Sequence, residues 1–348
     1  MMCDRCGVLL AEQLAPSKPK GAIPMLFASR AAVLRVVAGL SVVVLIVAAC
    51  SSTKNSAPQS TNAPVTTSGA SQPRTVSTTF ISYTSNQKFE ATVDALQKAA
   101  ADNGMMIVGD LNQDAVLAAT GLQLPGAHSF FVGNPRIGKT FFDATQAIGA
   151  VIPVRVHVWV DGNGPAHISY FDPAPEFTAV DPALGDAGQQ ISQSIRTIAE
   201  AAVGAGGAPQ ATPQVTKVDT TFITIDTSSS FEGTIGALHT AADQNGMTVL
   251  GDVNQASRLE AIGLQLQRSH SFFVGNPQIG KTLFGATQAI GAVVPVRMQV
   301  WAESRGPAHI SYFDPAPLFS VIDPARADIG QQVSQAIRKV AEAAAATH

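Results

Sequence analysis

The feature that most constrains this chain is that it contains the same long segment twice. Shifted by 142 residues, the segment 78–199 aligns with 220–341 without a gap, and 75 of the 122 aligned positions are identical. The identity is uneven, with 24 of 50 positions over 78–127 and 39 of 50 over 128–177. A self-similarity of this length predicts two domains of one fold.

The repeat sets the expected domain boundaries. Each copy holds about 130 residues, enough to bury a core of its own. We expect domains at 76–203 and 218–348, joined by a linker at 204–217 that is rich in Gly, Ala, Pro and Gln. Ahead of them, 50–75 is rich in Ser, Thr and Pro without apolar periodicity, which predicts a flexible tether.

Residue patterns inside each copy predict an α+β fold. Phe89, Val93 and Leu96 recur at helical spacing. Valine alternates with other residues from 154 to 160, which predicts a half-buried strand with a valine core face. A further helix is expected at 140–148. The predicted order is β-α-β-β-β-β-α, an antiparallel sheet with helices on one face.

A short apolar run near the N-terminus predicts export. Arg30 and Arg35 precede the run 36–49, which ends in small residues before Cys50. The run is too short for a membrane span, which needs roughly 20 apolar residues. Its end resembles the bacterial lipobox, in which the cysteine is acylated and becomes the first residue of the mature chain.

This pattern gives an expected location. We expect residues 1–49 to be a signal region, with Met25 as an alternative start, and Cys50 to carry lipid such as palmitate. An ordinary signal or a short anchor helix is the alternative. The lipidated protein would be held at the cell membrane on its extracytoplasmic face.

Three sequence landmarks resemble a known family. They are GNP after the third expected strand, AIGAVIPVRVHVWV, and a hairpin that ends in SYFDP. Together they resemble the bacterial and archaeal domain of unknown function 302, which occurs in tandem. The resemblance implies a fold like that of the TATA-binding protein, β-α-β4-α, and implies no established activity. Family members often carry cysteines where this chain has Gly133, Val154, Gly275 and Val296, so no thiol or metal role carries over.

Each copy also contains a glycine loop that fits the phosphate-binding pattern G-x-x-x-x-G-K-[ST]. The loops are GNPRIGKT at 133–140 and GNPQIGKT at 275–282. Pro135 removes one backbone N–H that such a loop needs, and phosphate loops open from parallel sheets, not antiparallel ones. The pattern is therefore interpreted as turn chemistry that leaves weak anion binding open. The candidate ligand residues in these loops are Asn134, Lys139, Asn276 and Lys281.

Four more candidate residues lie on the expected strand at 154–160 and its copy. Arg155 and Trp159 recur as Arg297 and Trp301, on the face opposite the valines. Both residue types are enriched at interaction hot spots, although an Arg stem packed over Trp would explain them equally well. All four lie in 128–177 or its copy, the segment that differs least between the repeats. We therefore expect all four at or beside a surface between the repeats.

Composition limits the function. The first domain has 6 Lys and Arg against 12 Asp and Glu, and the second 8 against 11, which argues against nucleic-acid binding. No catalytic residues, cofactor or metal ligands are predicted. The leading hypothesis is a cell-envelope lipoprotein with two non-catalytic domains that bind a small ligand or an envelope protein. The alternatives are a phosphate- or nucleotide-directed enzyme that uses the GNPxIGKT loops, and a structural pseudo-dimer.

Overall fold

The computed structural model describes residues 72–205, 212–303 and 306–347. Cys50, the signal region and nearly all of the expected tether lie outside them. The first repeat contains β1 (Arg74–Thr84), α1 (Phe89–Asp102), β2 (Met106–Asn112), α2 (Gln113–Ala118), β3 (Ala127–Gly133), α3 (Pro135–Ala144), η1 (Gln146–Ala150), β4 (Val154–Val160), β5 (Ala166–Phe171), α4 (Pro173–Val180), η2 (Pro182–Leu184) and α5 (Gly185–Val203).

The second repeat follows the same order. It contains β6 (Gln214–Asp226), α6 (Phe231–Gln244), β7 (Thr248–Asn254), α7 (Gln255–Glu260), β8 (Ser269–Gly275), α8 (Pro277–Ala286), η3 (Gln288–Ala292), β9 (Val296–Trp301), β10 (His309–Phe313), α9 (Pro315–Ile322), η4 (Pro324–Arg326) and α10 (Ala327–Ala346). The expected α+β class, with two tandem antiparallel repeats, is confirmed. Among the described helices, none combines the length and the apolar composition that a membrane crossing requires.

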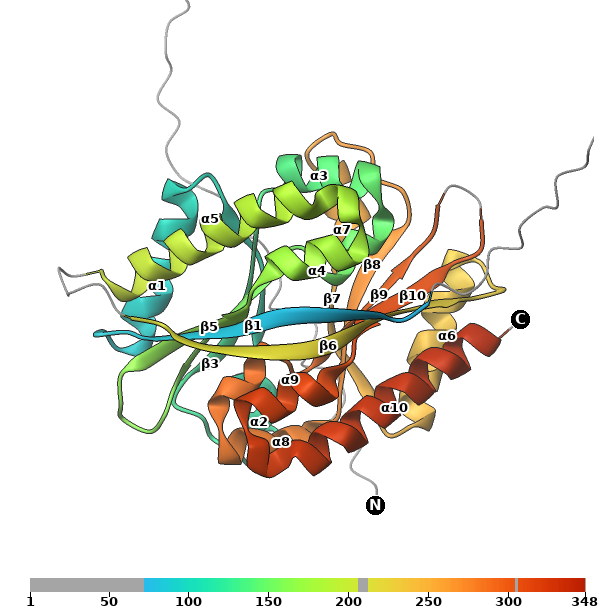
Figure 1. Ribbon diagram of the computed structural model, residues 1–348. Helices are drawn as coiled ribbons and strands as arrows, with labels where there is room; N and C mark the ends of the chain where they lie inside the picture. The colour runs from blue at the N-terminus through green and yellow to red at the C-terminus, as the bar shows by residue number, and fades with distance from the viewer. Residues whose placement is uncertain (1–71, 206–211, 304–305, 348) are drawn as a thin grey trace, which may run out of the picture. The chain divides into compact units, whose positions relative to one another are not determined.

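All ten of these strands belong to one antiparallel sheet, in the order β2-β3-β4-β5-β1-β6-β10-β9-β8-β7. The repeats meet at its centre, where β1 and β6 run side by side (Figure 1). Ser77 pairs with Asp219, its equivalent 142 positions later, and its Oγ donates a hydrogen bond to Asp219 Oδ1 at 2.5 Å. A pseudo-twofold axis therefore passes between these two residues.

This pairing changes where the domains begin. β1 starts at Arg74, inside the segment expected as tether, and β6 starts at Gln214, inside the segment expected as linker. The first halves of the two strands supply each other's backbone hydrogen bonds, so these residues are ordered by the partner repeat. Because this pairing involves both repeats, the sequence of one repeat by itself does not reveal it.

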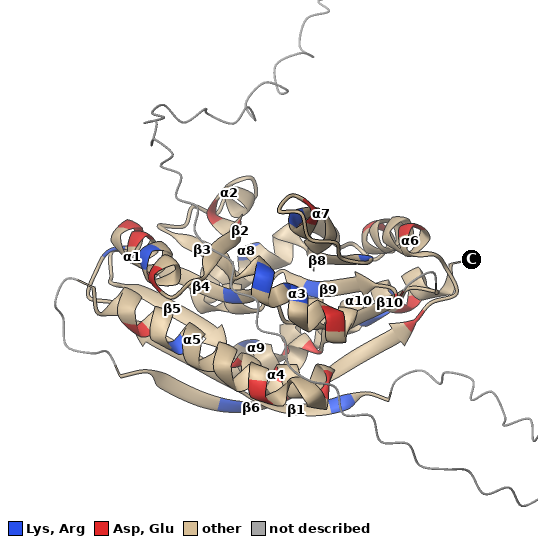
Figure 2. Cartoon of the chain, turned by 90° about the horizontal axis from the view of Figure 1, so that it is seen from above, with Lys and Arg blue, Asp and Glu red and all other residues tan. Residues whose placement is uncertain are grey.

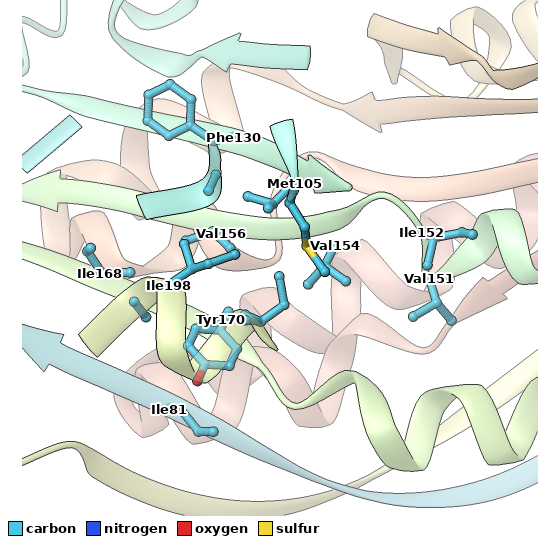
Figure 3. Packing of buried hydrophobic residues seen from close by; sticks show 14 of the residues in the cluster. Ile81, Met105, Phe130, Val151, Ile152, Val154, Val156, Ile168, Tyr170 and Ile198 are labelled. Atoms are coloured by element: carbon cyan, nitrogen blue, oxygen red, sulfur yellow. The ribbon is translucent and has the colours of Figure 1, made fainter. Parts of the chain in front are cut away.

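Each repeat has its own apolar core beneath its helices. In the first, Val154, Val156 and Val158 are buried with Ile198 of α5, as the valine alternation predicts. Figure 3 shows Val156, Ile168, Tyr170 and Ile198 within this cluster. On the outer surfaces of α1 and α5, acidic and basic residues are interspersed (Figure 2).

The helix predicted at 140–148 is wrong in its bounds. α3 starts at Pro135 and ends at Ala144, and the 3-10 turn η1 follows it. Asn134 Oδ1 accepts hydrogen bonds from the backbone N–H groups of Arg136 and Ile137, which caps the helix. Proline suits the first helical position because its missing N–H has no helical partner there. The Asn-Pro pair therefore marks a helix start and not a separate turn.

The same chemistry produces a helix that the sequence analysis missed. Asp172 Oδ1 accepts from the backbone N–H of Ala174, and Pro173 occupies the first helical position of α4. The run SYFDP is thus the end of a hairpin and the start of a helix. An Asn or Asp followed by Pro is a recognised start signal.

Candidate ligand site between the repeats

The repeats touch a second time, through the sheet faces that carry no helices. Ser129 Oγ on β3 donates a hydrogen bond to Gly291 O of the other repeat at 2.9 Å. Its equivalent Ser271 donates to Gly149 O at 3.0 Å. The rings of Phe131 and Phe273 stack with their centroids 4.6 Å apart. Each repeat therefore covers the open face of the other, with the same contacts made in both directions.

Two glycines allow the backbones to come this close. A Cβ atom on Gly291 would lie 2.1 Å from His157 Cε1, and one on Gly149 would lie 2.4 Å from Gln299 Cδ. His157 and Gln299 occupy equivalent positions and are fully buried. A side chain at either position would therefore clash with a buried neighbour, most severely at Gly291, where the clash is with the ring of His157.

The two arginines reach across this contact. Arg155 Nη2 donates to Pro295 O at 2.7 Å, and Arg297 Nη2 donates to Pro153 O at 2.7 Å. Both guanidinium carbons lie 5.3–5.8 Å from the ring centroids of Phe131 and Phe273. The side chains therefore lie between the repeats and close to phenylalanine rings.

The interpretation of Arg packed over Trp is wrong. Trp159 stacks on His167 with centroids 4.1 Å apart, and Trp301 stacks on His309 at 4.2 Å. Both tryptophans are buried, so they are not free to meet an outside partner. The aromatic contacts of Arg155 come instead from Phe131, its direct cross-strand partner, and from Phe273 of the other repeat, which is the closer ring.

The arginines line a cavity of about 90 Å³ together with Glu176 of α4. The rest of the lining is apolar and, apart from Pro315, comes from equivalent residues of both repeats. Glu176 is half-buried and is the single acidic residue among the described residues of the lining. In the second repeat its place is taken by Leu318. The lining is thus symmetric except at this position and at Pro315, whose equivalent Pro173 does not line the cavity.

Burial shifts the proton affinities of all three groups. It lowers the pKa of Arg155 to about 9, and the nearby charge of Arg297 lowers it further. Burial lowers the pKa of Arg297 to about 10. It raises the pKa of Glu176 to about 8, in spite of the opposing effect of Arg297. At pH 7 the cavity therefore holds two positive charges and a carboxyl group that is mostly uncharged.

The glycine loops do not join this site, and their backbone is already committed. The first-turn N–H groups of α3 donate to Asn134 Oδ1, and the Gly138 N–H donates to Asn134 O at 2.7 Å. Lys139 pairs with Asp143 one turn later. Asn276 caps α8 in the same way, and Lys281 Nζ donates to Thr120 O at 2.8 Å. No free row of backbone donors is left in these two loops for a phosphate.

We predict that the double substitution Lys139→Ala and Lys281→Ala changes the free energy of unfolding by no more than about 0.5 kcal/mol, because both are surface side chains. The variant and the parent should release no phosphate from ATP or GTP with Mg²⁺. Denaturant unfolding and a phosphate-release assay measure the two outcomes. Turnover that disappears in the double variant would contradict this interpretation.

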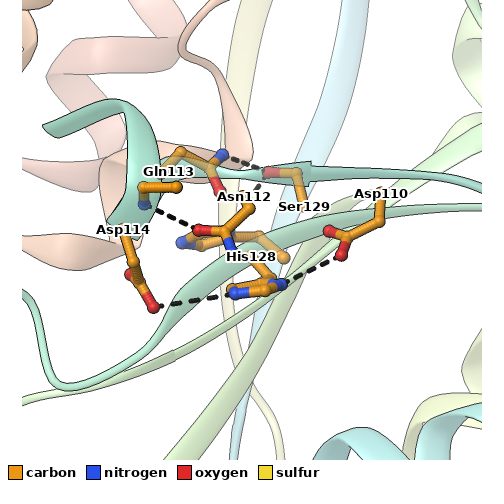
Figure 4. A network of polar contacts seen from close by, with 8 residues as sticks. Asp110, Asn112, Gln113, Asp114, His128 and Ser129 are labelled. Carbon is orange, nitrogen blue, oxygen red and sulfur yellow. Dashed lines mark hydrogen bonds and ion pairs between the residues drawn. The ribbon is translucent and has the colours of Figure 1, made fainter. Parts of the chain in front are cut away.

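Three histidines, His128, His270 and His309, lie within ion-pair distance of aspartates. His128 lies between Asp110, at 3.1 Å, and Asp114, at 3.6 Å (Figure 4). Burial alone would lower the pKa of His128, but the hydrogen bonds and charges of the two carboxylates raise it to about 9. Within the ranges that the structure covers, no group of three or more His, Cys, Asp or Glu is placed to hold a metal ion.

Sequence reasoning missed Glu176 and the two glycines of the contact. The signal for Glu176 was available: it is one of few differences in the well-matched segment 128–177, where its equivalent is Leu318. Gly149 and Gly291 are identical in both copies, but their role depends on a neighbour from the other repeat. Pattern analysis of one repeat cannot reveal such a neighbour.

Comparison with known proteins agrees with the repeated architecture. One family profile, described as Domain of unknown function DUF302, matches twice, over residues 81–202 and 223–344. The chain belongs to this family. A crystal structure of an uncharacterized conserved DUF302 protein from Bacillus stearothermophilus is 23% identical and covers 35% of this chain and 97% of that protein, with a TM-score of 0.33.

Some curated proteins match one part of the chain. A protein named Fluoride-specific ion channel FluC 1, from Brucella suis biovar 1 (strain 1330), is 28% identical over 104 residues, which are 30% of this chain and 41% of that protein. A protein of the same name from Brucella abortus biovar 1 (strain 9-941) is 28% identical over 104 residues and is covered to 38%. The chain thus spans less than half the length of these relatives.

Proposed function

We propose that this protein is a non-catalytic, lipid-anchored binding protein of the cell envelope, and that its two DUF302 repeats form one binding unit. The ligand is a small anion that enters the cavity between Arg155 and Arg297. One observation supports this above all: each repeat contributes a guanidinium group to the same partly enclosed cavity, where Glu176 is the single acidic residue among the described residues of the lining.

The electrostatics of the cavity favour an anion. Buried charges are unfavourable unless they are paired, and the backbone carbonyls that Arg155 and Arg297 contact do not neutralise them. A guanidinium carries five N–H donors, more than the carbonyl contacts use. An anion with two or three oxygens can accept such donors from both arginines and offset their mutual repulsion.

The curated relatives suggest one probe. Their names describe channels specific for fluoride, and they match this chain over part of their length. Fluoride therefore belongs beside acetate and phosphate in a first screen, with chloride as the background ion. All four are small enough to compare in a cavity of about 90 Å³.

We expect at least one of the three probe anions to bind the purified protein at pH 7 and to bind more weakly as the pH rises to 9. The pKa of Glu176 is about 8, so its carboxylate forms over this range and competes for the arginines. Isothermal titration calorimetry at several pH values measures the effect. Glu176→Leu is the matched variant, because Leu318 already occupies the equivalent position, and it should reduce the pH dependence to the part that comes from Arg155, whose pKa is about 9.

Two outcomes would contradict the proposal. One is the absence of heat with all three anions. The other is a pH profile that is the same in the parent and in Glu176→Leu. Either result would favour the structural pseudo-dimer, in which the arginine bonds to backbone carbonyls serve only to hold the repeats together.

A separate prediction concerns the anchor. Cys50 should be the first residue of the mature protein and should carry acyl chains, because it ends a lipobox-like run. Mass spectrometry of the N-terminal peptide from membranes tests this, with Cys50→Ser as the control that should leave the membrane fraction. An unmodified Cys50, or cleavage at another position, would contradict the expected anchor.

A further inference from the structure

We propose that the ligand of the arginine cavity is a short-chain aliphatic carboxylate. Its two oxygens lie between Arg155, Arg297 and Glu176, and its hydrocarbon end lies against the apolar part of the lining. Acetate is the member of this class whose size fits best. This ligand class rests on the proposed function, because it assumes that an anion enters the cavity.

Glu176 shares a small cavity with two arginines but is bonded to neither of them. Among the described residues it makes no hydrogen bond and no ion pair. Buried ionisable groups are ordinarily paired or hydrogen-bonded. Glu176 is half-buried, so its carboxyl is not sealed from the cavity that it lines. A molecule that lies between the three side chains would therefore give Glu176 the partner that the protein itself does not supply.

At pH 7 the carboxyl of Glu176 can donate a hydrogen bond to such a molecule. Burial raises its pKa to about 8. Of the charged groups that face it, Arg297 lowers this pKa and Asp172 raises it, and Arg155 lines the same cavity. A protonated carboxyl has one O–H donor. The cavity therefore offers a bound anion one O–H donor from Glu176 without a competing negative charge.

The arginines also retain donors for a ligand. Arg155 donates to Ala292 O at 3.4 Å and to Pro295 O at 2.7 Å, and Arg297 makes the two equivalent contacts. A guanidinium has five N–H donors, so these carbonyls leave part of each group unused. A carboxylate has two oxygens with about four lone-pair positions. It can therefore accept hydrogen bonds from both arginines and from Glu176 together.

The apolar part of the lining favours a ligand with a carbon end. It is formed by both repeats and includes Val151, Phe171, Val293 and Phe313. Phosphate has oxygen on every side, so some of its oxygens would face carbon without a donor, which is unfavourable. A carboxylate is polar at one end and apolar at the other. Its shape and polarity therefore match a cavity with donors on one part of its lining and carbon on the rest.

The volume of about 90 Å³ limits the length of the carbon chain. A cavity of ~150 Å³ holds benzene, which corresponds to about 25 Å³ for each of its heavy atoms. On this scale the arginine cavity holds about four heavy atoms, the number in acetate. Formate leaves part of the space empty, and benzoate is too large to be enclosed.

The test is calorimetric titration of the purified protein at pH 6 with formate, acetate, benzoate, phosphate and acetamide, against a chloride background. At this pH the carboxylate probes are ionised and Glu176 is protonated. We expect acetate to bind about fourfold more tightly than formate, the increase for burying one more carbon. Acetate should also bind more tightly than phosphate. Benzoate exceeds the volume and acetamide lacks the charge, so each should bind at least about tenfold more weakly than acetate.

Two substitutions of Glu176 test its hydrogen bond. Glu176→Gln keeps a neutral N–H donor at this position and should retain most of the affinity for acetate at pH 6. Glu176→Leu has no donor and should bind acetate at least about tenfold more weakly at the same pH, because hydrogen bonds to charged groups are among the stronger ones. Leucine already occupies the equivalent position, Leu318, so the fold accommodates it. Denaturant unfolding of both variants verifies that they are folded.

The possible failures can be told apart. Equal affinity for formate and acetate, or phosphate bound as tightly as acetate, would overturn the carboxylate class and leave the anion site in place. Equal binding of acetate by the parent and Glu176→Leu at pH 6 would overturn the hydrogen bond from Glu176. The absence of heat with every anion, fluoride included, would overturn the proposed function and the carboxylate class with it.

Discussion

Replacing Gly291 by alanine should lower the free energy of unfolding by about 3 kcal/mol, at the upper end of the cost of overpacking a core. The new methyl group would lie 2.1 Å from His157 Cε1. His157 is fully buried and hydrogen-bonded to Gln288 O at 2.8 Å, so it cannot rotate out of the way. Relieving the clash therefore requires a shift of His157 or of the backbone at the contact between the repeats. Denaturant unfolding of the variant and the parent measures the loss.

Gly236→Ala is the matched control for this substitution. Gly236 lies on the exposed side of α6, and a Cβ there would meet nothing within 4 Å. Alanine should stabilise this helix by up to about 1 kcal/mol, because glycine is a poor helix former. If the Gly291→Ala variant were as stable as the Gly236→Ala variant, the inference that the repeats pack closely at Gly291 would be wrong.

The second large effect is a loss of stability in acid caused by His157. Burial lowers the pKa of this side chain to about 3, well below the 6.5 of an exposed histidine. The unfolded chain therefore takes up a proton as the pH falls below 6.5, whereas the folded protein does not. By this linkage His157 should cost on the order of 3 kcal/mol between pH 7 and pH 4.

His157→Gln should remove this acid sensitivity. Gln299 occupies the equivalent position in the second repeat and bonds to Ser269 and Ser271. At position 157 a glutamine keeps Ser129, the equivalent of Ser271, as a neighbour, whereas Ala127 stands in place of Ser269. Unfolding in denaturant at pH 7, 5.5 and 4 compares the two proteins. Equal slopes of stability against pH would contradict the buried, neutral state of His157.

His128 provides an internal contrast, because its pKa is raised and not lowered. Its ion pairs with Asp110 and Asp114 contribute stability that is fully present below pH 6.5 and is lost as the pH rises through about 9. The two histidines therefore act in different pH ranges. A substitution of His157 should change only the acid side of the stability profile.

The parts of the fold that depend on local sequence could be predicted, and the parts that depend on the other repeat could not. Alternating valines from 154 to 160 identify a core face, because successive side chains of a strand point to opposite faces of the sheet. The order of strands and helices follows from similar patterns. The start of α3 was misread because Asn-Pro was interpreted as a turn, and α4 was missed because Asp-Pro was interpreted only as the end of a hairpin, although both are capped helix starts.

The candidate site depends on partners that no local pattern shows. The sequence indicates Arg155 and Arg297 as candidates, but not that Phe131 and Phe273 lie beside them. Buried glutamines such as Gln255 look like ordinary surface residues in a sequence, because only the tertiary structure shows that they are enclosed. The difference between the two copies at this position, Glu176 against Leu318, was the one sequence feature that could have indicated Glu176.

The pairing of Ser77 with Asp219 on the pseudo-twofold axis has a consequence for which side chains the two copies can place on opposite sides of the arginine cavity. Two separate, identical chains joined in this way would place the same side chain on both sides of the arginine cavity, either two carboxyls or two leucines. A single chain that carries both copies can hold one Glu176 opposite one Leu318. Fusion therefore permits an odd number of acidic groups between two arginines. Above the Glu176 pKa of about 8 this gives the cavity a net charge that a symmetric pair, with two carboxylates or two leucines, would not have.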